Sequence, residues 1–427
     1  RDRSTSDAGA TAVLTELEKN CGFLGLQEKG HALGSLQVFI TWNQQQLSAM
    51  LRINNMSWAR FMVLVSDFGT GKTILLKNLA RAEAERILFG TARPARVFYI
   101  SLGSAQYTKY DASWEDDSVF DIYTRMEFQN LKSNTGIDVE FKSTRDILNE
   151  MVLPGQRTSK LTINQLLVKF FLKYPQDHHY GDEVPTQDSI VGNLMFPTLV
   201  DGQDDVWRAA TGNIRLGLRP AELRNSNYSV ELGNYRATLS NQYNVQFPEL
   251  DHRMRNSAKV AQFSDVVNTG LGWTPGITGS LPPYINTVTG VTPKYILTKT
   301  SDEIYTKGVA YAIHNFIGNQ PVVILTMSSD EVEKTRNSLI SSGSPQRLTV
   351  YNPGPSGHYT DTQDKVRNYL QAPDGALITR VQLYNGMEAN HVITRQIQYH
   401  GWKSSAQQKS GTVFKKCLFL MEILTLV

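Results

Sequence analysis

The stretch VLVSDFGTGKTILLKNLA, residues 63–80, constrains the fold of this chain more than any other segment. An apolar run over Phe61–Val65 predicts a buried strand, and it passes through a glycine-rich turn into a pattern that predicts a helix over Ile74–Gly90. The apolar run Arg96–Leu102 predicts the next strand. A strand, a turn, a helix and a second strand make a βαβ unit, so the sequence predicts parallel strands with helices packed on them.

The turn itself is close to a phosphate-binding loop. Residues 66–73 read Ser-Asp-Phe-Gly-Thr-Gly-Lys-Thr, and the pattern Gly-x-x-x-x-Gly-Lys-Ser/Thr differs only in having glycine where this chain has Ser66. In that pattern, backbone amides surround the phosphates, the lysine reaches the outer phosphates and the hydroxyl binds magnesium. A buried strand before the turn and a helix N-terminus after it favour a bound anion. The expected nucleotide-binding residues are Ser66, Gly69, Thr70, Gly71, Lys72 and Thr73. The alternative is an ordinary glycine-rich turn between a strand and a helix.

An acidic pair supplies the carboxylates that such a loop needs. Residues 160–174, KLTINQLLVKFFLKY, have the spacing of an amphipathic helix, and Asp182 and Glu183 follow shortly after it. We expect Asp182 to hold magnesium together with Thr73, and Glu183 to activate the attacking water. A solvated acidic loop is the alternative, because residues 177–179 make a poor strand. The two histidines among them lack further ligands at metal spacing.

Composition indicates a folded chain with two or three domains. Its 427 residues are 41% hydrophobic and 19% charged, and the net charge of +3 does not by itself imply nucleic-acid binding. Cys21 and Cys417 lie far apart, which argues against a disulfide framework. No apolar run is long enough to span a bilayer, and the N-terminus lacks an apolar signal core. We therefore expect an intracellular protein, cytoplasmic or nuclear, without a membrane partner. Because the chain starts at Arg1 and stops in an apolar run, we also expect a fragment.

The alternation of predicted strands and helices restarts after residue 295. Residues 264–295 are rich in Gly, Pro and Thr and predict a linker, and the polar residues 105–160 predict an insertion in the first half. In the second half, the helix SSDEVEKTRNSLISSG is expected to open at a serine cap and to close at Gly343. Further helical patterns are EIYTKGVAYAIHNFI and residues 361–370, and the strand patterns are PVVILTM, RLTVYN and part of GALITRVQLYNGMEANHVI.

Three further segments carry a family resemblance. FPELDHRMRNSAKVAQF, residues 247–263, resembles the arginine segment of superfamily-one, UvrD-type helicases, with Arg255 at the position of the arginine that reaches the γ-phosphate. RVQLYNGMEANHVI, residues 380–393, resembles the family's Gly-x-Glu segment, in which Glu388 would contact the sugar. FITWNQQQLSAM is similar to the segment that reads adenine, with Gln44 the best-placed glutamine and the next two as alternatives. The segments follow one another in the family's order, although a basic helix end and a simple turn would also explain the first two.

The resemblance implies two RecA-like P-loop NTPase domains, of class α/β, with mainly parallel sheets covered by helices. The expected divisions are a peripheral segment 1–34, a first domain 35–263, the linker 264–295, and a second domain 296–427 that is C-terminally incomplete. ATP and Mg²⁺ would bind in a cleft between the domains. Lys72, Glu183 and Arg255 would be the catalytic residues, and Gln44 and Glu388 would complete the nucleotide site.

The chain departs from the helicase pattern at three places. In the Gly-x-Glu segment, Gln382 and Asn385 stand where the family has His and Lys. The segment that couples ATP to DNA is replaced by VWRAATGNI, residues 206–214, in which Thr211 and Gly212 are expected at a strand end. The last arginine segment is absent or degenerate, since Arg395 lacks its usual surroundings. An arginine at the transferred phosphate accelerates phosphoryl transfer by several powers of ten, so these departures predict slow turnover.

Three functions therefore stay open. The first is a helicase-like ATPase that moves on single-stranded nucleic acid. The second is a nucleotide-binding switch or scaffold that retains the fold without motor activity. The third is a protein-remodelling or signalling ATPase whose segment 105–160 contacts a protein partner.

Overall fold

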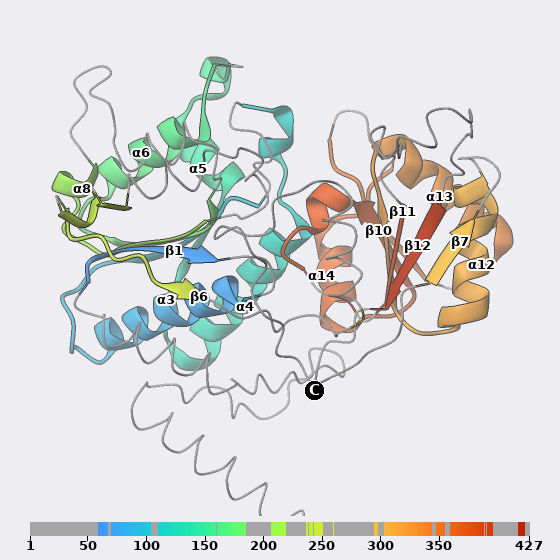
Figure 1. The fold of residues 1–427 in the computed structure, drawn as a ribbon, viewed down its shortest axis with the longest axis horizontal. Helices are drawn as coiled ribbons and strands as arrows, with labels where there is room; N and C mark the ends of the chain where they lie inside the picture. Colours follow the sequence, from blue (N-terminus) through green and yellow to red (C-terminus); the bar gives the residue numbers. More distant parts are fainter. Residues whose placement is uncertain are drawn as a thin grey trace, which may run out of the picture.

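The fold consists of two sheets with helices packed on them (Figure 1). The computed structural model describes residues 59–66, 70–103, 110–158, 160–184, 206–218, 236–237, 239–241, 243–250, 259, 294–297, 303–343, 347–354, 359–387, 389, 391–395 and 417–422. Within these ranges each sheet has six strands. The expected α/β class is therefore confirmed. The peripheral segment, the helix pattern at 45–58 and the linker 264–295 lie outside the described residues.

The first sheet is parallel throughout and has the strand order β3-β2-β4-β5-β1-β6. Its strands are β1 Phe61–Ser66, β2 Val97–Ser101, β3 Glu140–Ser143, β4 His178–Val184, β5 Ile214–Leu218 and β6 Glu249–Leu250. Strands buried on both faces read as continuous apolar runs, and β2, all of whose residues are buried, has the sequence VFYIS. Parallel strands place all their carboxyl ends on one side of the sheet, and α3, which follows β1, begins on that side.

Helices cover both faces of this sheet (Figure 1). Residues of α3 Lys72–Leu88 and α4 Val119–Thr135 pack into the core on one face. Residues of α5 Thr144–Met151, α6 Ile163–Lys173 and α8 Val206–Ala209 pack into the core on the other. The 3₁₀ turns η1 Ala112–Glu115 and η2 Pro154–Gln156 lie between these elements. The helices predicted after β1 and over residues 160–174 are thus confirmed.

Two segments differ from what the sequence predicts. Residues 105–160, expected as an insertion, include α4, α5 and the edge strand β3, so their described part is built into the fold. Thr211 and Gly212, expected at the end of a strand, lie in the turn before β5. The physical reason is that α8 precedes them and that the amide of Thr211 donates to the carbonyl of Pro175 at 2.7 Å, so the strand begins only at Ile214.

The second sheet has the strand order β7-β12-β11-β8-β10-β9. Its strands are β7 Lys294–Leu297, β8 Val322–Thr326, β9 Leu348–Tyr351, β10 Ala376–Arg380, β11 His391–Arg395 and β12 Cys417–Glu422. Four neighbouring strands, β11, β8, β10 and β9, are parallel, and β12 is antiparallel to both of its neighbours. The expectation of mainly parallel strands is therefore confirmed for the described part of both sheets.

The helices of this second unit follow the predicted order. They are η4 Ile304–Gly308, α12 Val309–Ala312, η5 Ile313–Ile317, α13 Ser329–Ser342, α14 Gln363–Gln371 and the 3₁₀ turn η6 Val381–Tyr384. The segments η4 and η5 are π-helical turns that continue α12 at its two ends. The hydroxyl of Ser328 accepts from the amide of Glu331 at the start of α13, and Gly343 ends the helix in the left-handed region, as the sequence predicts.

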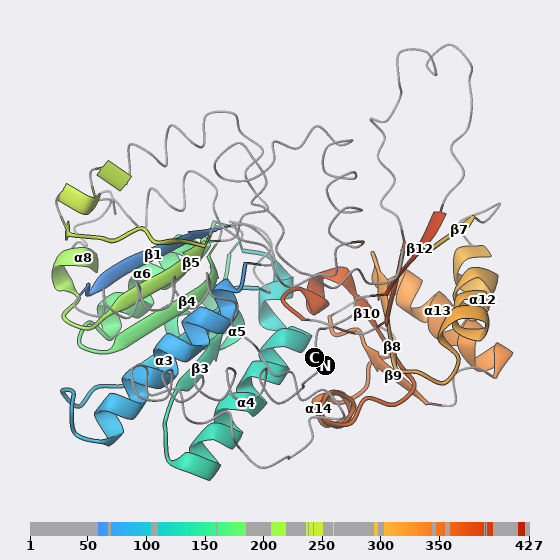
Figure 2. The ribbon, with the colours of Figure 1, turned by 60° about the horizontal axis from the view of Figure 1, so that its bottom comes forward.

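Helix α4 belongs to the cores of both units. Its residue Phe128 lies in the core of the first sheet, whereas Val119, Ile122 and Met126 lie in a cluster with residues of the second unit. The buried members of that cluster from the second unit are Val323, Tyr351, Val366, Tyr369, Leu377, Leu383 and Tyr384. Figures 1 and 2 both show α4 and α14 side by side between the two sheets. We call this cluster the α4 interface.

Polar contacts reinforce the α4 interface just before α4 begins. The backbone carbonyl of Asp117 accepts from the hydroxyl of Tyr351 at 2.6 Å, and its carboxylate accepts from Gln363 at 3.4 Å. Ser143, at the carboxyl end of β3, donates to the same carboxylate at 2.7 Å. Asp117 is 4% exposed, so its buried carboxylate is satisfied by donors from both units.

Asp121 gives the α4 interface a predicted pH dependence. It is fully buried as part of the capping box of α4, and burial together with the nearby Asp117 carboxylate raises its pKa from 3.8 to about 7. Because the folded-state pKa is the higher one, the folded protein holds this proton more tightly, and stability falls as pH rises from about 4 to about 7. We expect Asp121→Asn to remove this loss of stability. At pH 8 its free energy of unfolding should exceed that of wild type by about 2 kcal/mol, and the pKa shift sets an upper limit of about 4 kcal/mol.

Urea unfolding of both proteins at pH 4 and pH 8 measures this effect. Asp138→Asn is the matched control, because Asp138 is an exposed carboxylate that pairs with Lys132 at the surface. An Asp121→Asn variant with the same pH dependence of stability as wild type would contradict the assignment.

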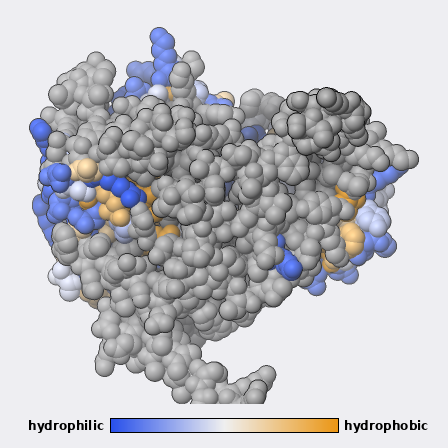
Figure 3. Space-filling model, viewed as in Figure 1, coloured by the Kyte–Doolittle hydropathy of each residue, from blue (hydrophilic) through white to orange (hydrophobic). Residues whose placement is uncertain are grey.

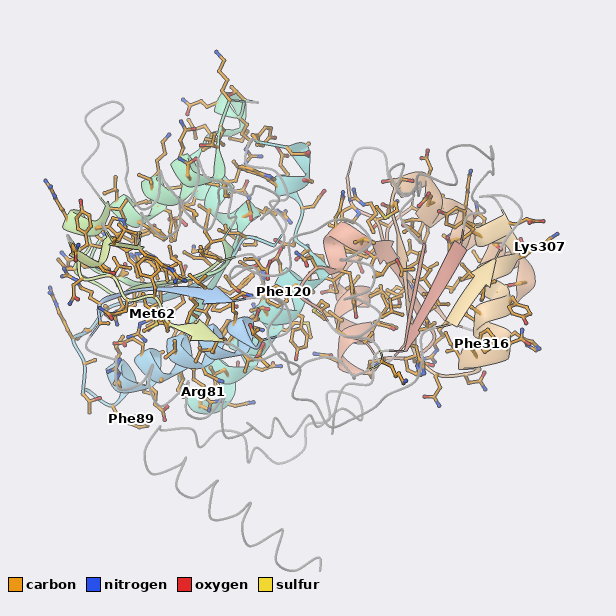
Figure 4. All side chains as sticks on the ribbon, viewed as in Figure 1. Met62, Arg81, Phe89, Phe120, Lys307 and Phe316 are labelled. Atoms are coloured by element: carbon orange, nitrogen blue, oxygen red, sulfur yellow. The ribbon has the colours of Figure 1, made fainter. Side chains whose placement is uncertain are left out.

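On one face of the molecule, the described surface is mainly polar (Figure 3). On the face in Figure 3 the coloured residues are mostly hydrophilic, with small apolar areas toward each end of the molecule. The exposed large apolar side chains include Phe89 and Phe316, which Figure 4 labels on different units. None of the helices in the described part of the chain combines the length and the apolar character that crossing a bilayer requires.

Candidate functional site

Helix α3 begins at the carboxyl ends of the strands of the first sheet. Gly71 is the residue before the helix, and its φ of 91° lies in the left-handed region that favours glycine. No side chain caps this helix end, and its first turn carries no acidic residue. A helix N-terminus of this kind favours an anion, since its first amides and its dipole point outward.

Lys72 and Thr73 begin α3, and both lie near Asp182 of β4. Lys72 is 6% exposed, although a lysine side chain is seldom buried without an anionic neighbour. Its charge lies close enough to Asp182 to lower the pKa of that carboxyl group. Thr73 donates a side-chain hydrogen bond to the same carboxyl group. The structure thus brings together three of the residues predicted from sequence.

Asp182 lies at the carboxyl end of β4, and β5 separates β4 from β1. Its side chain is fully buried, and burial raises its pKa, as does the charge of the adjacent Glu183. The hydrogen bonds from Tyr99 and Thr73 and the charge of Lys72 act in the opposite direction. Asp182 is therefore a fully buried carboxyl group that accepts hydrogen bonds at both oxygens and lies near the positive charge of Lys72.

Glu183 lies on an irregularity of β4. The pairing register of β4 with β5 shifts between Gly181 and Val184, and the φ of Glu183 is 56°, in the left-handed region where residues other than glycine are uncommon. The side chain of Glu183 is partly exposed, whereas its neighbours on both sides are buried. The register shift therefore leaves Glu183 partly exposed beside the buried Asp182.

Sequence reasoning missed Gly217, which lies close to Leu76 and to the carboxylate of Asp182. Gly217 lies in β5, and a Cβ atom added to it would stand 2.7 Å from the side chain of Leu76 and 3.4 Å from the carboxylate of Asp182. A side chain at position 217 would therefore contact Asp182 and would displace the terminal methyl group of Leu76 in α3. A glycine inside an apolar strand pattern is the signal that could have indicated such an approach.

Tyr99 is a second residue that sequence reasoning missed. It lies in β2, and its hydroxyl donates to Oδ2 of Asp182 at 2.8 Å. The other carboxylate oxygen, Oδ1, accepts from the backbone amide of Glu183 at 2.9 Å. The apolar run VFYIS contains no local signal for this contact, because Asp182 follows 83 residues later.

The two histidines ahead of the acidic pair have structural contacts. His179 is buried against the rings of Phe98 and Phe171, and burial lowers its pKa to about 4. His178 accepts from the amide of Asn213 at 3.1 Å and lies 3.7 Å from Glu83. Among the residues that the structure describes, no group of three or more His, Cys, Asp or Glu side chains could hold a metal ion by itself.

Several predicted site residues cannot be placed. Gln44, Gly69, Arg255 and Glu388 lie outside the described residues. Ser66 is the last residue of β1, and only its backbone is described. Their roles stay predictions.

The residues that can be placed fit a magnesium ion that is shared with a phosphate. Thr73 and Asp182 offer two oxygen ligands, and Mg²⁺ commonly takes one or two protein ligands and completes its shell with waters and phosphate oxygens. Lys72 supplies a buried positive charge, and the start of α3 supplies amides for the phosphates.

A comparison with models of known protein families gives no match to this chain, and a search among curated proteins gives none either.

Proposed function

We propose that the chain is an ATP-binding P-loop NTPase that hydrolyses ATP with Mg²⁺ and has two RecA-like domains similar to those of superfamily-one helicases. The observation that carries the proposal is the meeting of Lys72, Thr73 and Asp182 at the carboxyl edge of a parallel sheet. An ordinary glycine-rich turn gives no reason for a buried lysine and a buried carboxylate beside a helix N-terminus.

Each residue has a role that follows from its position. Lys72 and the first amides of α3 bind the phosphates, because they offer a buried positive charge and hydrogen-bond donors at the start of a helix. Thr73 and Asp182 hold the magnesium ion through their oxygens. Bound Mg²⁺ would neutralise charge on the phosphate oxygens. Glu183 orients the attacking water and accepts its proton, since it is the partly exposed carboxylate of the pair.

The nucleotide-binding switch is the second candidate function. It is favoured by the unusual coupling and final arginine segments, and by the α4 interface, which ties the two units together through buried apolar and polar contacts. A single-stranded nucleic acid remains the proposed track of the first candidate, and a protein partner is proposed for the second.

Magnesium-dependent ATP binding and hydrolysis by the purified chain test the proposal, with and without single-stranded DNA or RNA. We expect Lys72→Ala to weaken ATP binding by about 30-fold or more, because the loss of one member of a buried charge pair costs about 2 kcal/mol at the least. Lys307→Ala is the control, since Lys307 is an exposed lysine of the second unit, remote from α3 in Figure 4.

Each outcome separates the candidates. ATP hydrolysis stimulated by one polymer, and lost in Lys72→Ala alone, supports the motor. ATP binding that depends on Lys72 without turnover supports the switch. No binding of ATP by the wild-type chain would overturn both.

A further inference from the structure

Within the described part of the chain, the hydroxyl of Tyr99 donates one hydrogen bond, to Asp182. The ring of Tyr99 is fully buried, with its centroid 5.3 Å from that of Phe128 and 6.4 Å from that of Phe141. The one polar atom of the side chain reaches Asp182 Oδ2 at 2.8 Å. Burial and the Asp182 charge raise the pKa of Tyr99 well above its usual value, so the phenol keeps its proton and acts as a donor.

Strand register makes this contact possible. Ser101 of β2 is paired with Asp182 of β4, and Tyr99 is paired with Tyr180. Tyr99 and Asp182 are therefore diagonal neighbours on the same face of the sheet, a distance that a long aromatic side chain can span. The residue directly opposite Asp182 is a small serine, which leaves room for the phenol.

The carboxylate of Asp182 is consequently held at both oxygens. Tyr99 donates to Oδ2, the amide of Glu183 donates to Oδ1, and Thr73 also donates to the group. A carboxylate held by two fixed donors keeps its plane when a ligand arrives, so it loses little rotational freedom on binding. Its remaining lone pairs then have one preferred direction.

We propose that Tyr99 is a positioning residue for metal binding, which orients the Asp182 carboxylate for a magnesium ion through its hydrogen bond to Oδ2. The inference rests on the proposed function, because it concerns the same site. The inference assigns Tyr99 to the proposed site, although Tyr99 lies in β2, outside the phosphate-loop pattern of residues 66–73. Hydrogen-bond partners of metal ligands commonly change metal affinity by 10- to 100-fold when they are removed.

Mn²⁺ binding by the whole chain, in the presence of a nonhydrolysable ATP analogue, tests the inference by electron paramagnetic resonance. We expect Tyr99→Phe to bind Mn²⁺ about 10- to 100-fold more weakly than wild type, with unchanged affinity for the analogue without metal. Metal-free binding also shows that the variant is folded. Tyr369→Phe is the matched control, since it removes a buried phenol that donates to the backbone carbonyl of Val322 in the second sheet.

A double variant tests whether Tyr99 affects metal binding through Asp182. In an Asp182→Asn background, adding Tyr99→Phe is expected to cause no further loss of Mn²⁺ affinity, because the hydroxyl acts through that carboxylate. Wild-type Mn²⁺ affinity in Tyr99→Phe, or an undiminished effect in the Asp182→Asn background, would overturn the positioning role and leave the proposed function standing. Failure of the wild-type chain to bind the analogue at all would overturn the proposed function, and the inference with it.

Discussion

Replacing Glu183 with Gln is expected to lower the rate of ATP hydrolysis by about 10²- to 10⁴-fold, which is the usual contribution of a positioned general base. Glutamine has nearly the same size and keeps the bulge of β4, but it cannot accept the proton of the attacking water. ATP binding should change little, because Lys72 and the start of α3 remain in place. The measurement is single-turnover hydrolysis beside a separate binding titration.

Glu140→Gln is the matched control for this prediction. Glu140 is the first residue of β3, so it lies at the amino ends of the strands, away from Glu183. Its side chain is 43% exposed and paired with Lys142. Its replacement should leave hydrolysis unchanged. If Glu183→Gln hydrolysed ATP at the wild-type rate, the attacking water would be activated by another group and the assignment of Glu183 would be wrong.

Truncating Ile122 to Ala should destabilise the fold by about 2 to 5 kcal/mol, the usual cost of removing a large aliphatic side chain from a core. Ile122 is 1% exposed and lies at the α4 interface. Urea unfolding followed by circular dichroism measures the loss. Gln129→Ala is the matched control on the same helix, because Gln129 is exposed and should change stability by no more than about 0.5 kcal/mol.

Hydrogen exchange adds a test of which parts are destabilised by Ile122→Ala. Because α4 packs on both units, the amides of β2 and of β10 should lose protection together. Loss of protection in β2 with unchanged protection in β10 would show that the second unit does not depend on this contact.

The order of strands and helices could be predicted because its signals are local. Ser328 and Gly343 mark the ends of α13 in the sequence, and the glycine-rich turn marks the passage from β1 to α3. Strand β4 was harder to predict, since a polar start at His178 and His179 is untypical of a buried strand. Burial of His179 against two aromatic rings stabilises it in the neutral form, and those rings come from β2 and α6.

The candidate site could be predicted only in part, because only some of its residues have local signals in the sequence. Lys72, Thr73 and Asp182 belong to patterns that can be read within a few residues, and the structure brings them together. Tyr99 and Gly217 act through contacts with Asp182 and Leu76, which lie far away in the sequence. Such contacts depend on strand order, and nothing in a run such as VFYIS indicates which strand will lie beside it.

The sharing of α4 between the two units has a consequence for how the chain can be divided. A break in the backbone between Leu250 and Lys294 would separate the two sheets covalently, yet α4 would still fill the apolar face of the second unit. The two pieces, produced separately, should therefore recognise each other and reassemble as a noncovalent complex. The piece that begins after the break would otherwise expose Val323, Leu377 and Tyr384 to water, so it should be prone to aggregate when it is alone.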